Sequence, residues 1–509
     1  MISPVESRDA QLKLLGSGTR VPSFGVQLRR NPREEQRSNM RNIYTVSAGG
    51  YQLQTNICRG TFGSGGEFDP FRTEVQDGAG VVEWMREQDW YTGTFATCGG
   101  SYLGFVQWAT LYDAPKDLVA AVPCVSPHDF SRSLWPTGAT NLDFVKWADM
   151  IARQEEPRSI LTNLLRSRER KLEAALNSTP LITGAKTLLA GKTPWLDAIL
   201  SKSNLNDPYY TPMKLGQALE RTDLPVLIIT CWYDLFAEQS LEQYARLKER
   251  GCNVALTIGP WNHVKSVLAI EMNRHGFDWI ENHLAENKEA KRDAPVQYFV
   301  TGANEWRHAL EYPPPTKSST YYLHKGGALK SEPFQNDLAA SKFTFDPRSP
   351  TPTIGGTGLL TGGSLDDTSL AKRTDVLIFD TAALEQDLEI CGQPNVEISH
   401  STSSPFADIF VRVSEVDKKG RSHNVTEMFQ RLDPHRDQSA AIKLVLNHCA
   451  HRFAQGTKIR FMVAGGNFPQ YVRNHGVENS DGLGTEMCTV EHTVHHNSAR
   501  MSKVVLPVV

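Results

Sequence analysis

The sequence predicts an α/β protein in which a helical insertion interrupts a parallel sheet and an all-β region follows. Apolar strand-like runs alternate with amphipathic helix-like stretches between residues 50 and 127 and again between 220 and 294, as in parallel sheets with right-handed crossovers. From 128 to 219, helix-like stretches follow one another without a clear buried strand. Beyond 295, short alternating runs separated by Gly, Pro, Asp and Ser predict a β-sandwich.

A chain of 509 residues is too long for a single hydrophobic core, so we expect more than one domain. The expected segments are 1–127 (first part of the α/β core, with an atypical or shortened N-terminus), 128–219 (helical cap insertion), 220–294 (second part of the core) and 295–509 (C-terminal β-sandwich, a jelly roll).

The first part of the core contains one well-marked helix and two strands. In VQDGAGVVEWMREQ the apolar residues 75, 79, 82 and 85 recur every three or four positions and predict one helical face. TFATCGG predicts a strand that leads into a second helix, SYLGFVQWATLYD. LVAAVPCVS is a continuous apolar run of the kind buried in a parallel sheet.

The later segments have patterns of their own. DFVKWADMIARQ and RERKLEAALNS predict helices of the insertion. The strand pattern returns in LPVLIITCWYD, followed by the amphipathic FAEQSLEQYARLKER, the strand NVALTIGP and the helix LAIEMNRHGFDWIENHLAE. The strands expected in the C-terminal region are PVQYFVTG, TYYLH, VLIFDT, VEISHST, ADIFVRVSEV, IKLVLNH, KIRFMVAG and KVVLPVV.

Composition excludes several classes of partner. A net charge of −3, with 22% charged and 40% hydrophobic residues, favours neither nucleic acid nor an anionic membrane as a partner. No window approaches the roughly 18 apolar residues of a membrane helix. The first residues lack the apolar centre of a signal peptide, and the eight cysteines are scattered without a C-x-x-C pair. We therefore expect a cytoplasmic protein with a small-molecule substrate, and the sequence leaves a homodimer open.

Ser101 lies where a predicted strand meets a predicted helix, within Gly-Gly-Ser-Tyr-Leu-Gly at 99–104. This is the pattern of a nucleophile elbow, a sharp turn that lifts a serine hydroxyl clear of the backbone. The turn needs small neighbours, because a Cβ near the serine would collide with the adjacent strand and helix. Gly99 and Gly104 lie two before and three after the serine, so the usual G-x-S-x-G is met only on its first side. Taken alone, a Gly-rich turn is more often only a turn.

Two further residues complete a candidate triad. A serine nucleophile needs a base within hydrogen-bond reach and a buried acceptor that holds the base in one tautomer. In parallel-sheet hydrolases these follow the serine in the order Asp or Glu, then His. LPVLIITCWYD ends in Asp234 and NVALTIGPWNH ends in His263. An Asp there is often only a helix cap, and a lone His is more often a surface residue, but the three residues in this order favour a Ser–His–Asp triad.

Other clusters favour no cofactor. His492, His495 and His496 lie close together, but neighbouring positions alternate across a strand and no acidic or Cys partner has ligand spacing. We therefore expect no metal site. GTFGSGGEF is Gly-rich without the Lys-Ser/Thr of a phosphate loop or a following dinucleotide unit, so we also expect no nucleotide site.

Several longer segments match a known family. They are RGTFGSGGEFDPF at 59–71, EWMREQDWYTGTF at 83–95, GGSYLGFVQW at 99–108, CWYDLF at 231–236, GPWNH at 259–263, and in the β region GQPNVEISHSTSSPFADIFVRVSEVDKKGRSHNV and GGNFPQYVRN. Through them, roughly residues 50–509 resemble the cocaine-esterase-like and X-Pro dipeptidyl-peptidase group of α/β-hydrolases (the CocE/NonD hydrolases). The resemblance implies a hydrolase core with a helical cap and a β-sandwich packed against both.

The resemblance also implies roles for single residues. Ser101 would be the nucleophile, His263 the general base and acid, Asp234 the orienting carboxylate, and the N–H of Tyr102 a donor to the oxyanion. The positions that match the acyl-pocket lining of similar esterases are Phe236, Trp135 and Trp147. For the two tryptophans, plain core packing is the more frequent role.

The first fifty residues depart from the family. Relatives have a loop whose tyrosine hydroxyl is the second oxyanion donor. The nearest counterpart here is Arg30-Asn31-Pro32-Arg33, without the tyrosine, and nothing local favours Tyr44 as a substitute. Loss of one oxyanion donor costs about 10²–10³ in rate, so an intact triad could still be a weak catalyst.

We expect a serine hydrolase that cleaves a carboxylic ester or amide through an acyl-enzyme intermediate. One alternative is an acyltransferase on the same scaffold. A second is an X-Pro dipeptidyl-peptidase, whose site for a free amino group would use Glu155 and Glu156, the only adjacent acidic pair in the expected cap. The third is a catalytically silent, hydrolase-like binding protein, which the atypical N-terminus favours.

Overall fold

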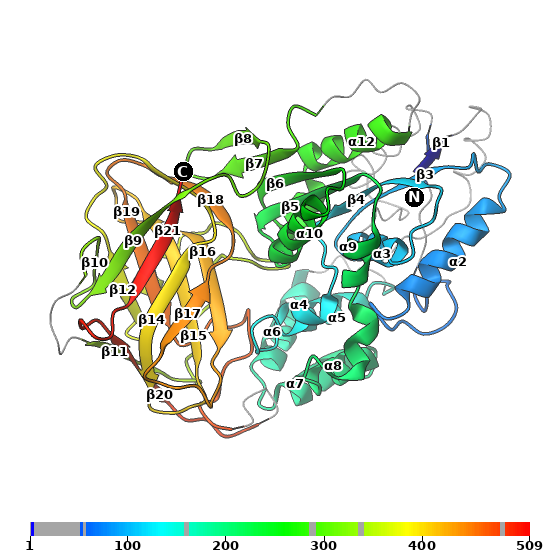
Figure 1. Cartoon of the computed structure of the whole chain (residues 1–509). Coiled ribbons are helices and arrows are strands. Elements are labelled where there is room, and N and C mark those ends of the chain that lie inside the picture. The colour runs from blue at the N-terminus through cyan, green and yellow to red at the C-terminus, as the bar shows by residue number, and fades with distance from the viewer. Residues whose placement is uncertain are drawn as a thin grey trace.

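The computed structural model describes residues 2–4, 51–53, 58–156, 162–284, 292–333, 340–478 and 484–509. An α/β part, a group of helices beneath it and an all-β part alongside make up the described chain (Figure 1). Residues 30–33, the nearest counterpart of the family's oxyanion loop, and Tyr44 lie outside the described residues.

An eight-stranded sheet forms the centre of the α/β part in the described ranges, in the order β2–β1–β3–β4–β5–β6–β7–β8. Its strands are β1 (Ile2–Pro4), β2 (Tyr51–Leu53), β3 (Phe95–Gly100), β4 (Leu118–Cys124), β5 (Val226–Tyr233), β6 (Val254–Asn262), β7 (Val296–Val300) and β8 (Glu305–Ala309). Strands β3 to β7 are parallel. β1 pairs antiparallel with β2 and β3, and β8 pairs antiparallel with β7.

Helices cover both faces of this sheet, which explains why its central strands are continuous apolar runs. Every residue of β5 is buried. On one face, α12 (Ile270–Leu284) packs Met272 and Ile280 against β3, β4 and β5. On the other face, α3 (Tyr102–Leu111) lies against β3 and β4, α10 (Ala237–Glu249) lies against β5 and β6, and α2 (Glu74–Arg86) packs on α3.

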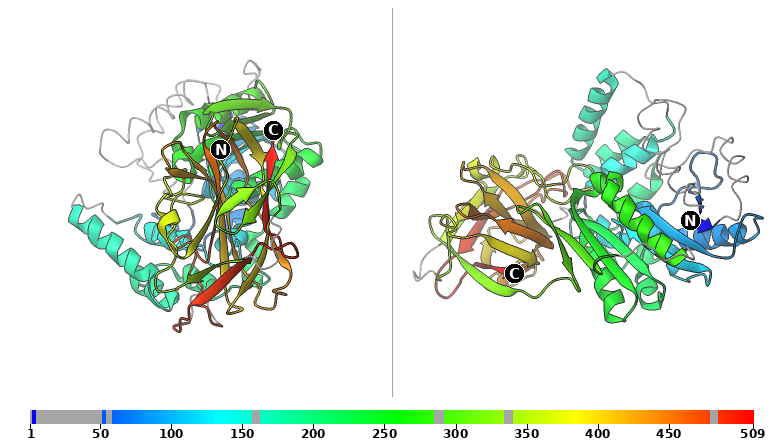
Figure 2. Two further views of the ribbon diagram at one scale, coloured as in Figure 1. Left: turned by 90° about the vertical axis from the view of Figure 1, so that its left-hand side faces the viewer. Right: turned by 90° about the horizontal axis from the view of Figure 1, so that it is seen from above.

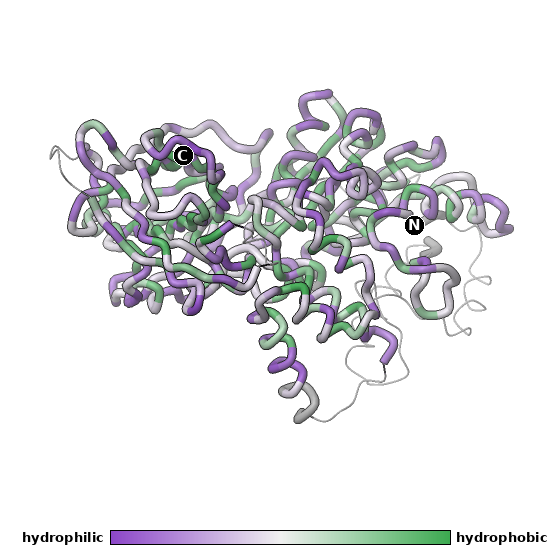
Figure 3. Tube along the Cα trace, turned by 90° about the horizontal axis from the view of Figure 1, so that it is seen from below, coloured by the Kyte–Doolittle hydropathy of each residue, from purple (hydrophilic) through white to green (hydrophobic). Residues whose placement is uncertain are grey.

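A group of helices connects β4 to β5, as the sequence predicts. They are α4 (Phe130–Leu134), α5 (Asp143–Ala152), α6 (Thr162–Leu176), α7 (Leu181–Leu189), α8 (Pro194–Leu200), the 3₁₀ helix η3 (Pro208–Met213) and α9 (Gly216–Arg221). One helix of this group, drawn in cyan, extends from the body of the molecule in Figure 2. It is α6, whose run RSRERKLE colours it as hydrophilic in Figure 3. No helix within the described ranges has the length and apolar character needed to cross a membrane.

The structure corrects the expected start of the β-sandwich. β7, which lies within PVQYFVTG, and β8 belong to the sheet of the α/β part, because β7 pairs with β6. The first strand of the all-β part is β9 (Lys317–His324), about twenty residues beyond the expected boundary at 295. A short strand near the edge of a mixed sheet and a sandwich strand can have the same sequence pattern, so the sequence does not separate them.

Thirteen strands form the all-β part in the described ranges, linked through the order β11–β20–β14–β21–β9–β10–β12–β19–β15–β16, with β13, β17 and β18 branching from it. Beyond β9 these are β10 (Ala328–Lys330), β11 (Ala340–Phe345), β12 (Val376–Asp380), β13 (Leu388–Gly392), β14 (Asn395–Thr402), β15 (Asp408–Val416), β16 (Ser422–Arg431), β17 (Ala441–Val445), β18 (Cys449–Phe453), β19 (Lys458–Ala464), β20 (Val490–His495) and β21 (Lys503–Val508). Apolar residues such as Ile398, Val411 and Phe461 form a second core. The jelly-roll topology stays a prediction.

A buried ionic cluster lies within the all-β part. The Arg412 side chain is fully buried and donates to Glu427 and to Asp367. Burial raises the pKa of Glu427, and the attraction of Arg412 opposes that shift. Each of these charges would be costly if it were buried alone.

Candidate active site

Ser101 occupies a strained turn between a strand and a helix. β3 ends at Gly100, α3 begins at Tyr102, and Ser101 itself has φ +60° and ψ −124°. A Cβ on Gly99 would lie 2.6 Å from the Leu103 Cβ, and one on Gly104 would lie 2.4 Å from the Ser126 Cβ. The two glycines are therefore required where small neighbours are expected from the sequence. Ser101, which lies between them, has a backbone conformation that non-glycine residues rarely adopt.

Asp234, His263 and Ser101 form one continuous chain of hydrogen bonds. The His263 Nδ1–H donates to Asp234 Oδ1 over 2.7 Å, and the Ser101 hydroxyl donates to His263 Nε2 over 2.9 Å. Because an ionised carboxylate only accepts hydrogen bonds, Asp234 fixes the tautomer in which Nε2 is free to accept. All three side chains are buried. The structure thus brings together three residues that the sequence separates by 162 positions.

The ends of two parallel strands place the acid and the base. Asp234 directly follows β5, and His263 opens the short helix α11 (His263–Leu268) directly after β6. Asn262 caps α11, since its side chain accepts from the Lys265 N–H over 3.0 Å. The Asn262 side-chain amide also donates to the Gly362 carbonyl over 2.6 Å. A loop from the C-terminal region thereby fixes the residue beside His263.

The Tyr102 amide is the donor that the turn leaves available. Tyr102 is the first residue of α3, a position whose N–H has no partner within its own helix. No group in the described part of the chain accepts a hydrogen bond from this N–H. The Ser101 N–H, in contrast, donates to the Cys124 carbonyl over 2.9 Å, so it is engaged within the sheet.

Aromatic side chains surround Tyr102. Its ring centroid lies 4.5 Å from that of Phe71 and 6.4 Å from those of Phe68 and Trp147. Trp195 extends this group, 5.3 Å from Trp147. Phe68 is not among the site residues predicted from the sequence, although it lies in the family-like segment GTFGSGGEFDPF. Trp195 is not among them either, because it has no local signal.

Of the three expected acyl-pocket residues, Phe236 contacts the triad histidine, Trp147 packs against Tyr102, and Trp135 does neither. Trp147 packs near Tyr102, as described above. The Phe236 ring meets the His263 ring edge-on, with centroids 5.5 Å apart. Trp135 is buried in the core at the end of α4, and among the described residues it makes no ring contact with Tyr102 or His263.

A carboxylate is buried on the far side of Tyr102. The Tyr102 hydroxyl donates to Glu74 and accepts from the Phe71 N–H over 3.3 Å. Burial raises the pKa of Glu74 and raises that of Tyr102 well above its ordinary value. The pair holds the Tyr102 ring against the aromatic group.

The C-terminal histidines form side-chain hydrogen bonds. His492 Nδ1 and His400 Nε2 lie 3.1 Å apart, and the His495 and His496 rings pair with Ser401 and Ser341. Among the described residues, no group of three or more His, Cys, Asp or Glu side chains is arranged to hold a metal ion.

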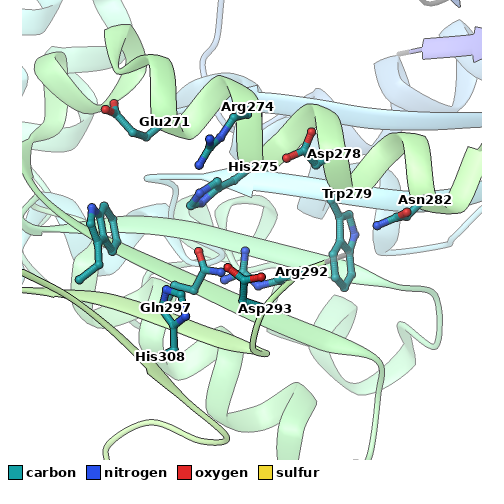
Figure 4. A pocket seen from close by; sticks show the side chains of 11 residues that line it. Glu271, Arg274, His275, Asp278, Trp279, Asn282, Arg292, Asp293, Gln297 and His308 are labelled. Atoms are coloured by element: carbon teal, nitrogen blue, oxygen red, sulfur yellow. The ribbon is translucent and has the colours of Figure 1, made fainter. Parts of the chain in front are cut away.

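A separate pocket lies between α12 and the β7–β8 hairpin, away from the triad (Figure 4). It has a volume of about 220 Å³, and charged side chains of both signs, among them Arg274, Asp278 and Arg292, line it. Burial lowers the pKa of His275 in this pocket to about 4. None of its lining residues belongs to the triad, so it is not the candidate active site.

Comparisons with known proteins identify the family. The model of X-Pro dipeptidyl-peptidase (S15 family) matches residues 21–265, and that of the X-Pro dipeptidyl-peptidase C-terminal non-catalytic domain matches residues 287–505. The cocaine esterase of Rhodococcus sp. (strain MB1 Bresler) is 27% identical over 517 residues, which cover 90% of this chain and 88% of the esterase. The chain belongs to the X-Pro dipeptidyl-peptidase-like family of hydrolases. It is a serine hydrolase that acts on ester or amide bonds.

Solved structures show the same fold. An α-amino acid ester hydrolase covers 96% of this chain and 91% of its own, with a TM-score of 0.81 at 19% identity. A CocE/NonD family hydrolase of Staphylococcus aureus covers 98% of this chain and 85% of its own, with a TM-score of 0.64 at 17% identity. The predicted fold class, an α/β-hydrolase core with a C-terminal all-β region, is confirmed.

Proposed function

We propose that Ser101, His263 and Asp234 are the catalytic triad and that the enzyme works through an acyl-enzyme intermediate on carboxylic esters. The observation that carries this proposal is the hydrogen-bonded chain from Asp234 through His263 to a serine on a strained turn. A hydroxyl in such a chain loses its proton to the imidazole as it attacks a carbonyl carbon.

The reaction proceeds in two halves. The Ser101 oxygen attacks the carbonyl carbon while His263 Nε2 takes the hydroxyl proton, and the Tyr102 N–H donates to the developing oxyanion. His263 then gives its proton to the leaving alcohol, and the C–O bond breaks to leave an ester on Ser101. A water molecule gives a proton to His263 as it attacks this ester, and His263 returns that proton to the Ser101 oxygen as the C–O bond breaks and the acid is released.

The surroundings of Tyr102 favour an apolar acyl group. The rings of Trp147 and Phe68 pack against the ring of Tyr102, the residue that follows the nucleophile, and Phe236 lies against His263. Aromatic side chains of this kind bind apolar groups through buried area and ring contacts. We therefore propose ester substrates with an apolar acyl part.

The contacts of the acidic pair favour an esterase over an X-Pro dipeptidyl-peptidase. The Glu156 carboxylate is paired with Lys192 over 2.5 Å and with Arg153 over 3.5 Å. Glu155 accepts from the Phe62 N–H over 2.6 Å. Because these carboxylates already have partners, they do not form a preorganised site for a free amino group.

Trapping the acyl-enzyme tests this proposal. The protein is mixed with a p-nitrophenyl ester, quenched in acid within one turnover and digested for mass spectrometry. We expect the acyl mass on the peptide that contains Ser101, and its absence in Ser101→Ala. An acyl group on any other residue would contradict the proposal.

Adding an alcohol or amine during turnover measures acyl transfer, because a transferase would yield the new ester or amide in preference to the acid. Cytoplasmic location and a homodimer stay predictions.

A further inference from the structure

A polar cavity adjoins the triad acid where three regions of the chain meet. It has a volume of about 170 Å³. Asp234 lines it from the α/β core, Thr137 lines it from the inserted helical region, and Asn467 lines it from the all-β part. The C-terminal region therefore reaches the immediate surroundings of the triad.

Buried polar atoms of this cavity lack partners among the described protein groups. Asp234 uses Oδ1 to accept from His263, but its Oδ2 is buried and no group in the described part of the chain donates to it. The Asn467 side chain is 3% exposed, and neither its Nδ2 nor its Oδ1 has a partner among the described residues. Leaving a carboxylate oxygen and an amide unpaired in the interior is costly.

Solvent bound in this cavity would satisfy both groups. A single water needs roughly 10–15 Å³ of cavity volume, so a cavity of about 170 Å³ has room for several. A water that accepts from the Asn467 Nδ2–H can donate its own hydrogen to Asp234 Oδ2. Bridges of this kind are nearly as favourable as direct hydrogen bonds.

We propose that Asn467 is a positioning residue for Asp234 and acts through hydrogen-bonded solvent in this cavity. The proposal rests on the proposed function, since it requires Asp234 to be the triad carboxylate. Its side-chain amide supplies a hydrogen-bond donor in a cavity that the triad acid also lines.

Backbone contacts hold Asn467 in place. The segment 465–474, GGNFPQYVRN, lies against the inserted region, where the Leu142 N–H donates to the Gln470 carbonyl and the Val472 N–H donates to the Thr140 carbonyl, both over 2.9 Å. On the other side, the Phe468 carbonyl accepts from the Thr353 N–H over 2.7 Å. Asn467 therefore lies in a segment that is bonded to the all-β part and to the inserted helices.

Charged groups around the cavity have partners of their own. The charged and titratable residues that line it, besides Asp234, are Arg132, Glu238, Glu427 and Tyr471. Arg132 pairs with Glu242, Glu238 with His448, and Glu427 with Arg412. Burial raises the pKa of Tyr471, and it also raises that of Cys231, which lies near Asp234. Asn467 is thus a neutral donor near the triad acid, among charges that are already paired.

The effect of Asn467 on the triad has a defined sign. His263 and Asp234 together carry one negative charge when His263 is neutral, and none after they take up a proton. A donor aimed at Asp234 Oδ2 stabilises the negatively charged state. Without it the pair binds the proton more tightly, so the acid limb of the pH–rate profile moves to higher pH, by about one unit.

The test measures the rate of fluorophosphonate labelling across about pH 5 to 9. Asn467→Leu keeps the branched shape and removes the donor, and Asn467→Asp keeps the size and replaces the donor by an acceptor. Asn474→Leu is the matched control, because Asn474 is buried in the same segment but donates to Asp408 over 2.9 Å. Thermal midpoints are measured for all variants.

We expect both Asn467 variants to move the acid limb of the pH–rate profile to higher pH. For a p-nitrophenyl ester, we expect kcat to be reduced by a larger factor than KM is raised. Asn474→Leu should lower the thermal midpoint and leave the acid limb in place. An unchanged acid limb in a folded Asn467→Asp protein, with Ser101→Ala unlabelled, would overturn the positioning role alone. Labelling of Ser101→Ala at the wild-type rate would instead overturn the proposed function on which it rests.

Discussion

The close packing of Gly104 gives a sharp prediction about the elbow. An added Cβ would lie 2.4 Å from Ser126 Cβ and 3.1 Å from the Cys124 carbonyl oxygen, about 1 Å inside ordinary carbon–carbon contact in the first case. The added Cβ would collide with the Ser126 side chain and the Cys124 backbone at the end of β4. Gly104→Ala must therefore move the start of α3 by a distance of that order.

This displacement is expected to affect activity more than stability. Overpacking costs about 1–3 kcal/mol, and the better helix propensity of Ala offsets about 1 kcal/mol of that. A 1 Å misplacement of reacting groups costs about 10²-fold in rate. We expect kcat/KM for a p-nitrophenyl ester to fall by about that factor, with a small drop in the thermal midpoint.

Gly80→Ala is the matched control. Gly80 lies on the exposed side of α2, and a Cβ there would have no neighbour within 4 Å. It should raise stability by about 0.8–1 kcal/mol and leave kcat/KM unchanged. Wild-type activity in Gly104→Ala would refute the argument that this glycine is required by the close approach of α3.

Three further outcomes are expected. Burial lowers the pKa of His492 to about 3, below the value of about 6.5 in an unfolded chain. The unfolded state therefore binds that proton more tightly, and the free energy of unfolding falls as the pH drops below about 6.5, by about 1.4 kcal/mol per pH unit. His492→Gln should flatten this fall when thermal midpoints are measured against pH. A pH dependence unchanged in His492→Gln would contradict the prediction. Arg412→Met leaves two carboxylates buried without a cation and should cost about 3–5 kcal/mol, whereas Arg421→Met, at an exposed pair, should cost less than about 1 kcal/mol; equal thermal midpoints would count against the buried cluster. Trp147→Leu should raise KM for esters with a bulky acyl group, while Trp135→Leu should lower only stability; a KM effect of the same size in both would place the two rings in one pocket.

Local patterns predict the elements that surround the triad. β5 and β6 are mostly apolar and end directly before Asp234 and His263, so their carboxyl ends predict where the two residues meet. The elbow is predicted equally well, because steric crowding at Gly99 and Gly104 leaves a sequence signature. In these places the residue types are determined by contacts close in sequence or by the sheet itself.

Long-range pairing is not predictable in the same way. β7 has the alternation of a sandwich strand, and only its hydrogen bonds to β6 assign it to the core sheet. Trp195 joins the aromatic group around Tyr102 through the folding of the inserted helices, which no local pattern records. Asn467 reaches the cavity at Asp234 from 233 residues further along the chain. Each of these depends on tertiary contacts that single-sequence patterns do not contain.

Fluorophosphonate labelling of the wild type, Ser101→Ala and His263→Ala tests the central claim most directly. An activated serine requires both the nucleophile and its base, so the account predicts a labelled wild type and loss of labelling in both variants. A well-folded wild-type protein that does not react would contradict it, and would favour a hydrolase-like binding protein instead.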